Sequence, residues 1–376
     1  MLPASSAFSP RHPHMVEARR GAGRVNALDA ARGVLLILSV SAEAVLSPRP
    51  NAFVHTEWVG LHYYDWIFPL FVSLSGCGMA FLFRSKSSWR RNIRRVAVLI
   101  VAGLAYNYVV EPNRGWAELR YTGVLQLYAG LVLLVGVLHF VLRRTWHWAG
   151  FTIALSCLMT TYWLAVSRHC PGAIPQPTCN TTLAVEGSFF DISHMYRKGA
   201  RGFEPEGLLG IFGALTTASA GVTAGHLLKS KSTPIDKARH VLTWSACSAV
   251  VGMILWLAIP GLKWLWTPSY GLVTGSAGLI LLAVWYWLID AGPFRGRLLA
   301  WSKPLRALGR NSLLVYFGSH VAMMMMLRVG DPDLPHRIAG HLEWTGYPGA
   351  AWVVLVVSAW WLTAIALDRR QIYIRA

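Results

Sequence analysis

Charged residues are scarce in this chain, and their scarcity excludes most soluble folds. They make up 14% of the 376 residues, against roughly 25% in soluble domains. Apolar residues make up 54%, and several apolar stretches are longer than a helix buried in a soluble core. We therefore expect an all-α polytopic integral membrane protein.

The chain also lacks the signatures of several common catalytic sites. It contains no GxxxxGK[ST] loop, no GxGxxG after a strand, no HExxH and no GxSxG, which argues against an ATPase, a zinc protease or an α/β-hydrolase. Its five cysteines form neither a CxxC pair nor a zinc spacing, so no metal site is predicted. Cys170 and Cys179 share one polar loop and would form a disulfide in an oxidising compartment.

What the chain does have is a succession of about ten apolar spans, separated by turns that contain Gly and Pro. They are predicted at residues 28–46, 65–83, 93–110, 121–142, 148–166, 206–228, 240–259, 269–290, 311–327 and 349–368. A transmembrane domain would thus cover residues 28–368, between a disordered basic tail at 1–27 and a short tail at 369–376. No apolar stretch precedes the first span, so we expect no cleavable signal.

The distribution of Lys and Arg predicts which way the spans run. Alternate loops and tails place 24 of these residues on one side and 10 on the other, and the richer side is normally cytoplasmic. Both termini are then cytoplasmic, and the long 167–204 loop lies outside. The basic residues lie between the apolar spans. The net charge of +18 is therefore better explained by membrane topology and contact with anionic lipid than by binding of nucleic acid. The Ala, Arg, Gly and Trp usage favours a bacterial plasma membrane.

One stretch combines titratable side chains with a membrane span. Residues 55–83 read HTEWVGLHYYDWIFPLFVSLSGCGMAFLF, and His55 lies on the predicted outer side. Its ordinary pKa suits proton transfer near neutral pH. Asp65 lies close in sequence, and Glu43 approaches the outer end of the first span, so either carboxylate is a candidate partner for the imidazole.

Two further groups of polar residues are candidates for binding. Asp29 and Arg32 stand three residues apart on one face of the first span, where charges are functional candidates by default. The segment 181–207, at the end of the outer loop, carries His194 and Glu206 among acidic and aromatic residues that suit a sugar or an amine. At nearly 40 residues, that loop is longer than ordinary connections and is typical of a binding loop.

Several blocks of the sequence, in order, resemble one known family. They are LDAARGVLLIL, HTEWVGLHYYDWIFPLFVSLSG, RYTGVLQ, FEPEGLLG, LWTPSYGLVTGSAGLILLAVWYWLID and GRNSLLVY. Together they are similar to the heparan-α-glucosaminide N-acetyltransferases and their bacterial relatives. The resemblance implies transfer of an acetyl group from cytosolic acetyl-CoA to an amino sugar or cell-surface glycan on the far side of the membrane.

The resemblance also implies roles for individual residues. His55 falls on the family's active-site histidine, with Asp65 or Glu43 as its partner. Donor contacts are expected at Asp29, Arg32, Arg120, Gln126 and Asn311, and acceptor contacts at Trp58, His194 and Glu206. A homodimer stays open.

Two other readings of the sequence also stay open. A transporter or permease would use Asp29, Arg32 and Glu43 as a substrate or proton path. A relative without activity would have a structural role. Binding of CoA thioesters separates the acyltransferase from the transporter.

Overall fold

The computed structural model describes residues 25–83 and 89–374, and within these ranges the regular structure is helical. Most of the tail predicted at residues 1–27 lies outside the described residues. The longer helices are α2 (Asn26–Ala44), α3 (Tyr63–Leu82), α4 (Trp89–Val110), α5 (Val124–Leu138), α6 (Thr145–Ser167), α8 (Leu208–Leu228), α9 (Pro234–Ala258), α10 (Pro268–Tyr286), α13 (Ser312–Met326) and α15 (Pro348–Arg369). The shorter ones are α7 (Thr182–Glu186), α11 (Arg295–Trp301), α12 (Lys303–Arg310) and α14 (Leu334–Gly340).

Each predicted span coincides with one of the ten longer helices. Seven helices of the described ranges are long and apolar enough to cross a membrane, and α5 and α13 are apolar but shorter. The all-α polytopic membrane fold is therefore confirmed. That all ten helices cross the bilayer stays a prediction.

Helix ends that the charge count assigns to the cytoplasm lie together at one end of the bundle. The Asp290 carboxylate accepts the backbone N–H of Ala27 at 2.8 Å and the side-chain amide of Asn26 at 3.2 Å. Arg310 contacts both Asp29, at 3.6 Å, and Asp368, at 2.9 Å. Because Asp290 satisfies an N–H of the first helical turn, α2 begins at Asn26, two residues before the predicted boundary.

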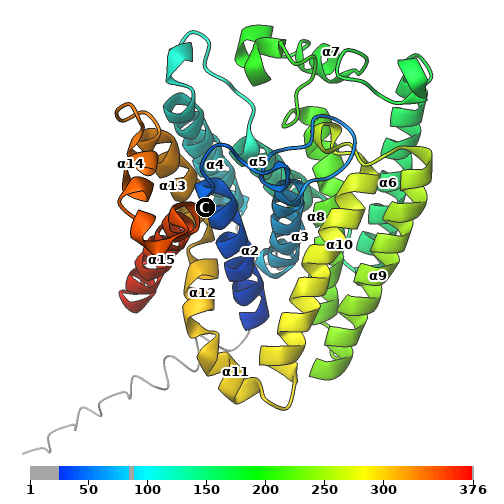
Figure 1. Cartoon of the computed structure of the whole chain (residues 1–376). Coiled ribbons are helices and arrows are strands. Elements are labelled where there is room, and N and C mark those ends of the chain that lie inside the picture. The colour runs from blue at the N-terminus through cyan, green and yellow to red at the C-terminus, as the bar shows by residue number, and fades with distance from the viewer. Residues whose placement is uncertain (1–24, 84–88, 375–376) are drawn as a thin grey trace, which may run out of the picture.

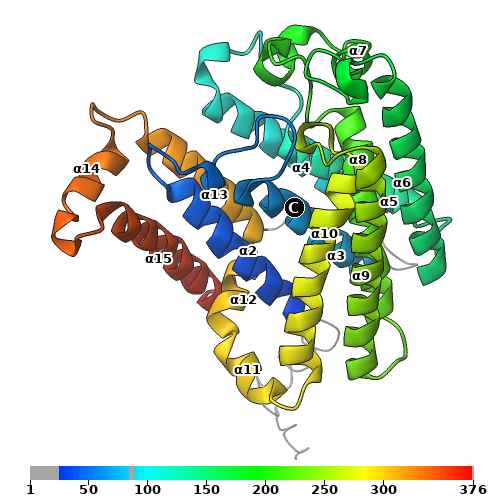
Figure 2. The same ribbon diagram turned by 45° about the vertical axis from the view of Figure 1, so that its right-hand side comes forward.

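The helices divide into two groups about α2. Figures 1 and 2 both show α13, α14 and α15 on one side of α2, and α6, α8, α9 and α10 on the other. In Figure 1 the α7 segment lies at the top of the bundle and α11 at the bottom. The long outer loop and the predicted cytoplasmic ends are thus at opposite ends of the molecule.

Glycines bring α3 and α8 into close contact at the centre of the bundle. A Cβ atom built on Gly221 of α8 would lie 2.0 Å from the carbonyl oxygen of Ser73, and one on Gly76 of α3 would lie 2.1 Å from that of Ala218. Small residues allow such an approach between membrane helices, where van der Waals packing contributes much of the association energy. α3 is therefore fixed against the most buried of the candidate spans.

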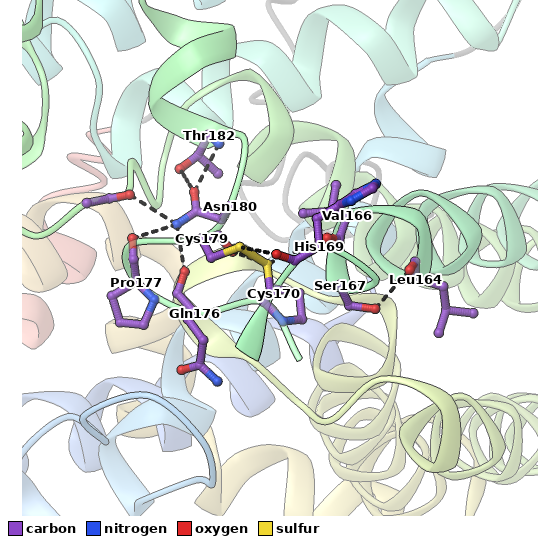
Figure 3. Close-up of a disulfide and its surroundings, with 12 residues drawn as sticks. Leu164, Val166, Ser167, His169, Cys170, Gln176, Pro177, Cys179, Asn180 and Thr182 are labelled. Carbon is purple, nitrogen blue, oxygen red and sulfur yellow. Dashed lines mark hydrogen bonds between the residues drawn. A yellow bond between two sulfur atoms is a disulfide. The ribbon is translucent and has the colours of Figure 1, made fainter. Parts of the chain in front are cut away.

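The outer loop is held by a covalent bond and by one asparagine. Cys170 and Cys179 form a disulfide with their Cα atoms 5.6 Å apart, as Figure 3 shows. The amide of Asn180 donates to the carbonyl oxygens of Pro177 and Gly202 at 2.8 and 3.0 Å. The start of the loop is thus fastened to the segment that leads into α8.

The α3–α8 contact predicts opposite effects of the same substitution at two glycines. Gly221→Ala should destabilise the protein by about 1–3 kcal/mol, because the backbones must move apart. Gly150→Ala in α6, where a Cβ would meet no atom within 4 Å, should stabilise the helix by about 0.5–1 kcal/mol. Thermal unfolding in one detergent compares the two. A Gly221→Ala protein that melts at or above the wild-type temperature would contradict the close packing.

Candidate active site

Asp65 connects the His55 loop to the first turn of α3. One of its carboxylate oxygens, Oδ2, accepts the backbone N–H groups of His62 at 2.9 Å and Thr56 at 3.1 Å. Carboxylates are stabilised at a helix N-terminus because unpaired N–H groups and the helix dipole meet there. The side chain is fully buried. One carboxylate thus fixes the loop and leaves its other oxygen, Oδ1, for a second function.

Oδ1 of Asp65 faces His55. The Nδ1 atom of His55 lies 2.9 Å from it, and the ring packs on Tyr64 with centroids 4.5 Å apart. We assign the Nδ1 proton to this hydrogen bond, since a carboxylate can only accept. The Nε2 atom makes no hydrogen bond with any residue that the structure describes, so its lone pair is free for a substrate.

Lys263 completes the group and was not singled out from the sequence. It lies in a short turn between α9 and α10, where its ammonium donates to Asp65 Oδ1 at 2.8 Å and approaches Nδ1 of His55. Burial lowers the pKa of Lys263 to about 8, against the opposing effect of Asp65. It lies two residues before the LWTPSY block, and this was the only sequence signal for it.

These neighbours determine the protonation state of His55. Loss of hydration lowers the pKa of His55, Lys263 lowers it further, and Asp65 acts in the opposite direction. The net effect is a pKa below the ordinary value, so the imidazole is neutral at neutral pH. A neutral imidazole whose Nδ1–H is held by a carboxylate is the arrangement of a general base.

Glu43 does not contact His55 in this arrangement. Its carboxylate accepts the hydroxyl of Tyr64 at 2.7 Å and lies 3.1 Å from Nδ1 of His320. Tyr64 therefore stands between Glu43 and His55. Of the two candidate carboxylates, Asp65 is the direct partner of the imidazole, and Glu43 belongs to a neighbouring group.

His55 opens into a small cavity of about 190 Å³ with mostly aromatic walls. Its lining includes His55, Asp65, Lys263, Glu206, Tyr196, Trp264, Trp266, Phe68 and Tyr316. Apart from the His55 group, Glu206 is the acidic side chain that lines it. Such a mixture of rings and one carboxylate suits a small polar ligand with an apolar face.

Glu206 is held in place by Arg120. The Arg120 guanidinium donates to Glu206 at 2.6 Å and to Glu204 at 2.8 Å, and lies over the Tyr196 ring at 4.8 Å. Burial raises the pKa of Glu206, Arg120 opposes this, and Glu204 adds to it. Arg120, expected among the donor contacts, thus lies at the His55 end, because two acidic residues of the outer loop pair with it.

A second, larger cavity of about 640 Å³ lies toward the other end of the bundle. Asp29, Arg32, Arg95 and Arg310 line it together with apolar residues of α3, α5 and α13. Arg32 donates to the carbonyl of Leu74 at 3.3 Å, next to Gly78, where a side chain would collide with the guanidinium. Asp29 and Arg32 are thus brought together, as their spacing predicted, at the edge of a cavity.

The other two expected donor residues line neither cavity. Gln126 is enclosed between α4 and α5, and its amide atoms make no hydrogen bond with the described residues. Asn311 is fully buried and accepts the backbone N–H of Ile374 at 3.3 Å. Their positions indicate packing between helices and attachment of the C-terminal segment.

Two of the expected acceptor residues also lie outside the small cavity. Trp58 donates its indole N–H to the carbonyl of Pro175 at 2.7 Å and so fastens the outer loop. His194 contacts the carbonyl of Leu119 at 2.8 Å and stacks on Tyr121. Glu206 is the residue of this set that reaches the cavity.

Comparison with known proteins supports the resemblance found in the sequence. Residues 24–182 match the family described as "Heparan-alpha-glucosaminide N-acetyltransferase, catalytic". The mouse protein heparan-alpha-glucosaminide N-acetyltransferase is 24% identical over 372 residues, covering 81% of this chain and 54% of the relative. The human protein of that name is 25% identical over 364 residues, covering 79% and 53%. This chain therefore spans about half the length of these relatives.

The contact between Lys263 and the His55–Asp65 pair predicts a pH effect. In Lys263→Met the pKa of His55 should rise, because a nearby cation is lost. The rate at which diethyl pyrocarbonate modifies His55, followed by mass spectrometry across pH, would then have a higher midpoint. Lys198→Met, which removes a lysine paired with Glu118, is the matched control. Equal midpoints in both variants would show that Lys263 does not act on His55.

Proposed function

We propose that this chain is a membrane acetyltransferase, because residues 24–182 match the family described as "Heparan-alpha-glucosaminide N-acetyltransferase, catalytic" and two proteins of that name are similar to it. It would move an acetyl group from cytosolic acetyl-CoA to an amino sugar or glycan on the other side of the membrane. The observation that carries this proposal is the His55–Asp65 pair, which lines a small aromatic cavity.

The larger cavity suits the donor. Three arginines, Arg32, Arg95 and Arg310, line it at the end predicted to be cytoplasmic. Guanidinium groups bind phosphate in bidentate geometry and are favoured wherever phosphate is recognised. The apolar lining beyond them would accept the extended arm that carries the thioester, so the acetyl group would point toward His55.

The small cavity suits the acceptor. The Glu206 carboxylate would attract the ammonium group of an amino sugar, and the rings of Tyr196 and Trp264 would cover the apolar face of the sugar. Arg120 then serves to position Glu206, which replaces its expected role as a donor contact. A cationic acceptor also offsets the burial that raises the pKa of Glu206.

The transfer step follows from this placement. The bound ammonium first loses a proton to water, and the neutral nitrogen then forms a bond to the acyl carbon while the carbon–sulfur bond breaks. Nε2 of His55 takes the proton that the nitrogen loses and returns it to the sulfur, so that CoA leaves as the thiol. Asp65 stabilises the imidazolium that forms between these two events, as a carboxylate behind a catalytic histidine does.

Removal of the base tests the proposal directly. His55→Gln should lower transfer from radiolabelled acetyl-CoA to glucosamine by about 10²–10⁴-fold, the usual contribution of a general base. His341→Gln changes an exposed histidine of α14's C-terminal end and should leave transfer intact. Wild-type transfer rates in a folded His55→Gln protein would sink the assignment.

If Glu206 binds the acceptor, its substitution should affect the KM for the acceptor alone. Glu206→Gln should raise the KM for glucosamine about 10-fold, because a charge-assisted hydrogen bond is worth roughly 1.5–3 kcal/mol, and should leave the KM for acetyl-CoA unchanged. Glu118→Gln, at a carboxylate paired with Lys198, is the control. If the KM for the donor rises and that for the acceptor does not, Glu206 belongs to the donor site.

A further inference from the structure

The two cavities meet at two aromatic residues. Phe68 of α3 and Tyr316 of α13 line both the small cavity at His55 and the large cavity at Arg32. The remaining residues of each lining belong to one cavity alone. Anything that extends from the arginines to His55 must therefore pass these two rings.

One face of α3 runs along the whole route. Positions spaced three or four residues apart share a face of a helix. Among the α3 residues that line the cavities, this spacing joins Asp65, Phe68, Phe71, Ser75, Gly78 and Leu82. From Asp65 to Leu82 the helix rises about 26 Å at 1.5 Å per residue, most of the roughly 30 Å hydrocarbon core. The stripe would form one wall of a passage that crosses most of the membrane.

Neighbouring rings hold both aromatic residues in place. The Phe68 ring lies 5.0 Å from that of Trp266, on the side of the small cavity, and 5.9 Å from that of Tyr128, on the side of the large one. The Tyr316 ring lies 5.5 Å from that of Phe71. The pairs with Trp266 and Phe71 are edge-to-face, and such pairs add to the burial energy of each ring. The narrow part of the route is therefore built from well-supported side chains.

The Tyr316 hydroxyl is available to form a hydrogen bond. It makes no hydrogen bond with any residue that the structure describes, although it lies within a helix predicted to span the membrane. Tyr316 lines both cavities, so a ligand there would lie beside it. A carbonyl of a ligand in the passage would satisfy this hydroxyl.

We propose that Phe68 and Tyr316 form a constriction through which the acyl end of the donor reaches His55, and that this constriction limits the width of the acyl group. The Tyr316 hydroxyl donates a hydrogen bond to a carbonyl of the donor as it lies there. This inference rests on the proposed acyltransferase function and assigns the donor specificity of the same site to two residues.

The test uses the purified full chain, glucosamine, and three donors of increasing width: acetyl-CoA, isobutyryl-CoA and benzoyl-CoA. In Phe68→Ala and in Tyr316→Ala, kcat/KM for the wide donors relative to acetyl-CoA should rise about 10-fold or more, the discrimination that one added or missing methylene typically brings. Val132→Ala, which enlarges the large cavity only, is the matched control and should leave this ratio unchanged.

A second variant separates the hydroxyl from the ring. Tyr316→Phe keeps the width of the constriction and should lower kcat/KM for acetyl-CoA up to about 10-fold, the effect of one hydrogen bond, without changing the preference among donors. If Phe68→Ala fails to fold, Phe68→Leu widens the same point with less loss of volume.

Each result has a definite meaning. A wild-type protein that transfers acetyl groups, with the same donor preference in every folded variant, overturns the constriction but leaves the proposed function intact. Variants that CoA still stabilises against heat but that transfer from no donor also overturn it, because a wider passage cannot exclude the narrowest acyl group. A wild-type protein that transfers from no donor ends the proposed function and this inference together.

Discussion

The carboxylate of Asp65 is the interaction on which the rest of the site depends. It accepts four hydrogen bonds, from two backbone N–H groups, from His55 and from Lys263. Two of these fix the loop to α3, and two set the orientation and charge state of the imidazole. A buried carboxylate needs such partners because an isolated charge is costly to remove from water. The same carboxylate therefore fixes the loop and orients the imidazole of His55.

α3 has two roles that constrain each other. One face carries Gly76 and packs against α8 at backbone contact, and another carries the stripe from Asp65 to Leu82 along the two cavities. Tight packing on the first face fixes the side chains on the second. A shift of α3 along its axis would move Asp65 away from Lys263 and Phe68 away from Trp266 together. The close glycine contacts thereby maintain the geometry of a site that is some distance away.

The two cavities carry charges of opposite sign, which match the two proposed substrates. Arginines line the large cavity, toward the predicted cytoplasm, where phosphate groups would arrive. A carboxylate, Glu206, lines the small cavity at the other end, where a cationic amine would arrive. Arg120 and Lys263 also lie at that end, but each is paired with acidic side chains. The pairing with Glu204 and Glu206 holds Arg120 at this end of the molecule, away from the donor site that its motif suggested.

The sequence alone determined the helical membrane fold, the positions of the long apolar helices and the candidacy of His55. Hydropathy acts over about 20 consecutive residues, and the motif around His55 is likewise continuous, so both are visible along the chain. Lys263 was not visible, because 208 residues separate it from His55 and a single lysine in a loop has no pattern. The choice between Asp65 and Glu43 also needed the structure, since both carboxylates were near enough in sequence. Only the packing of α3 against α10, α13 and the outer loop decided which polar side chains meet.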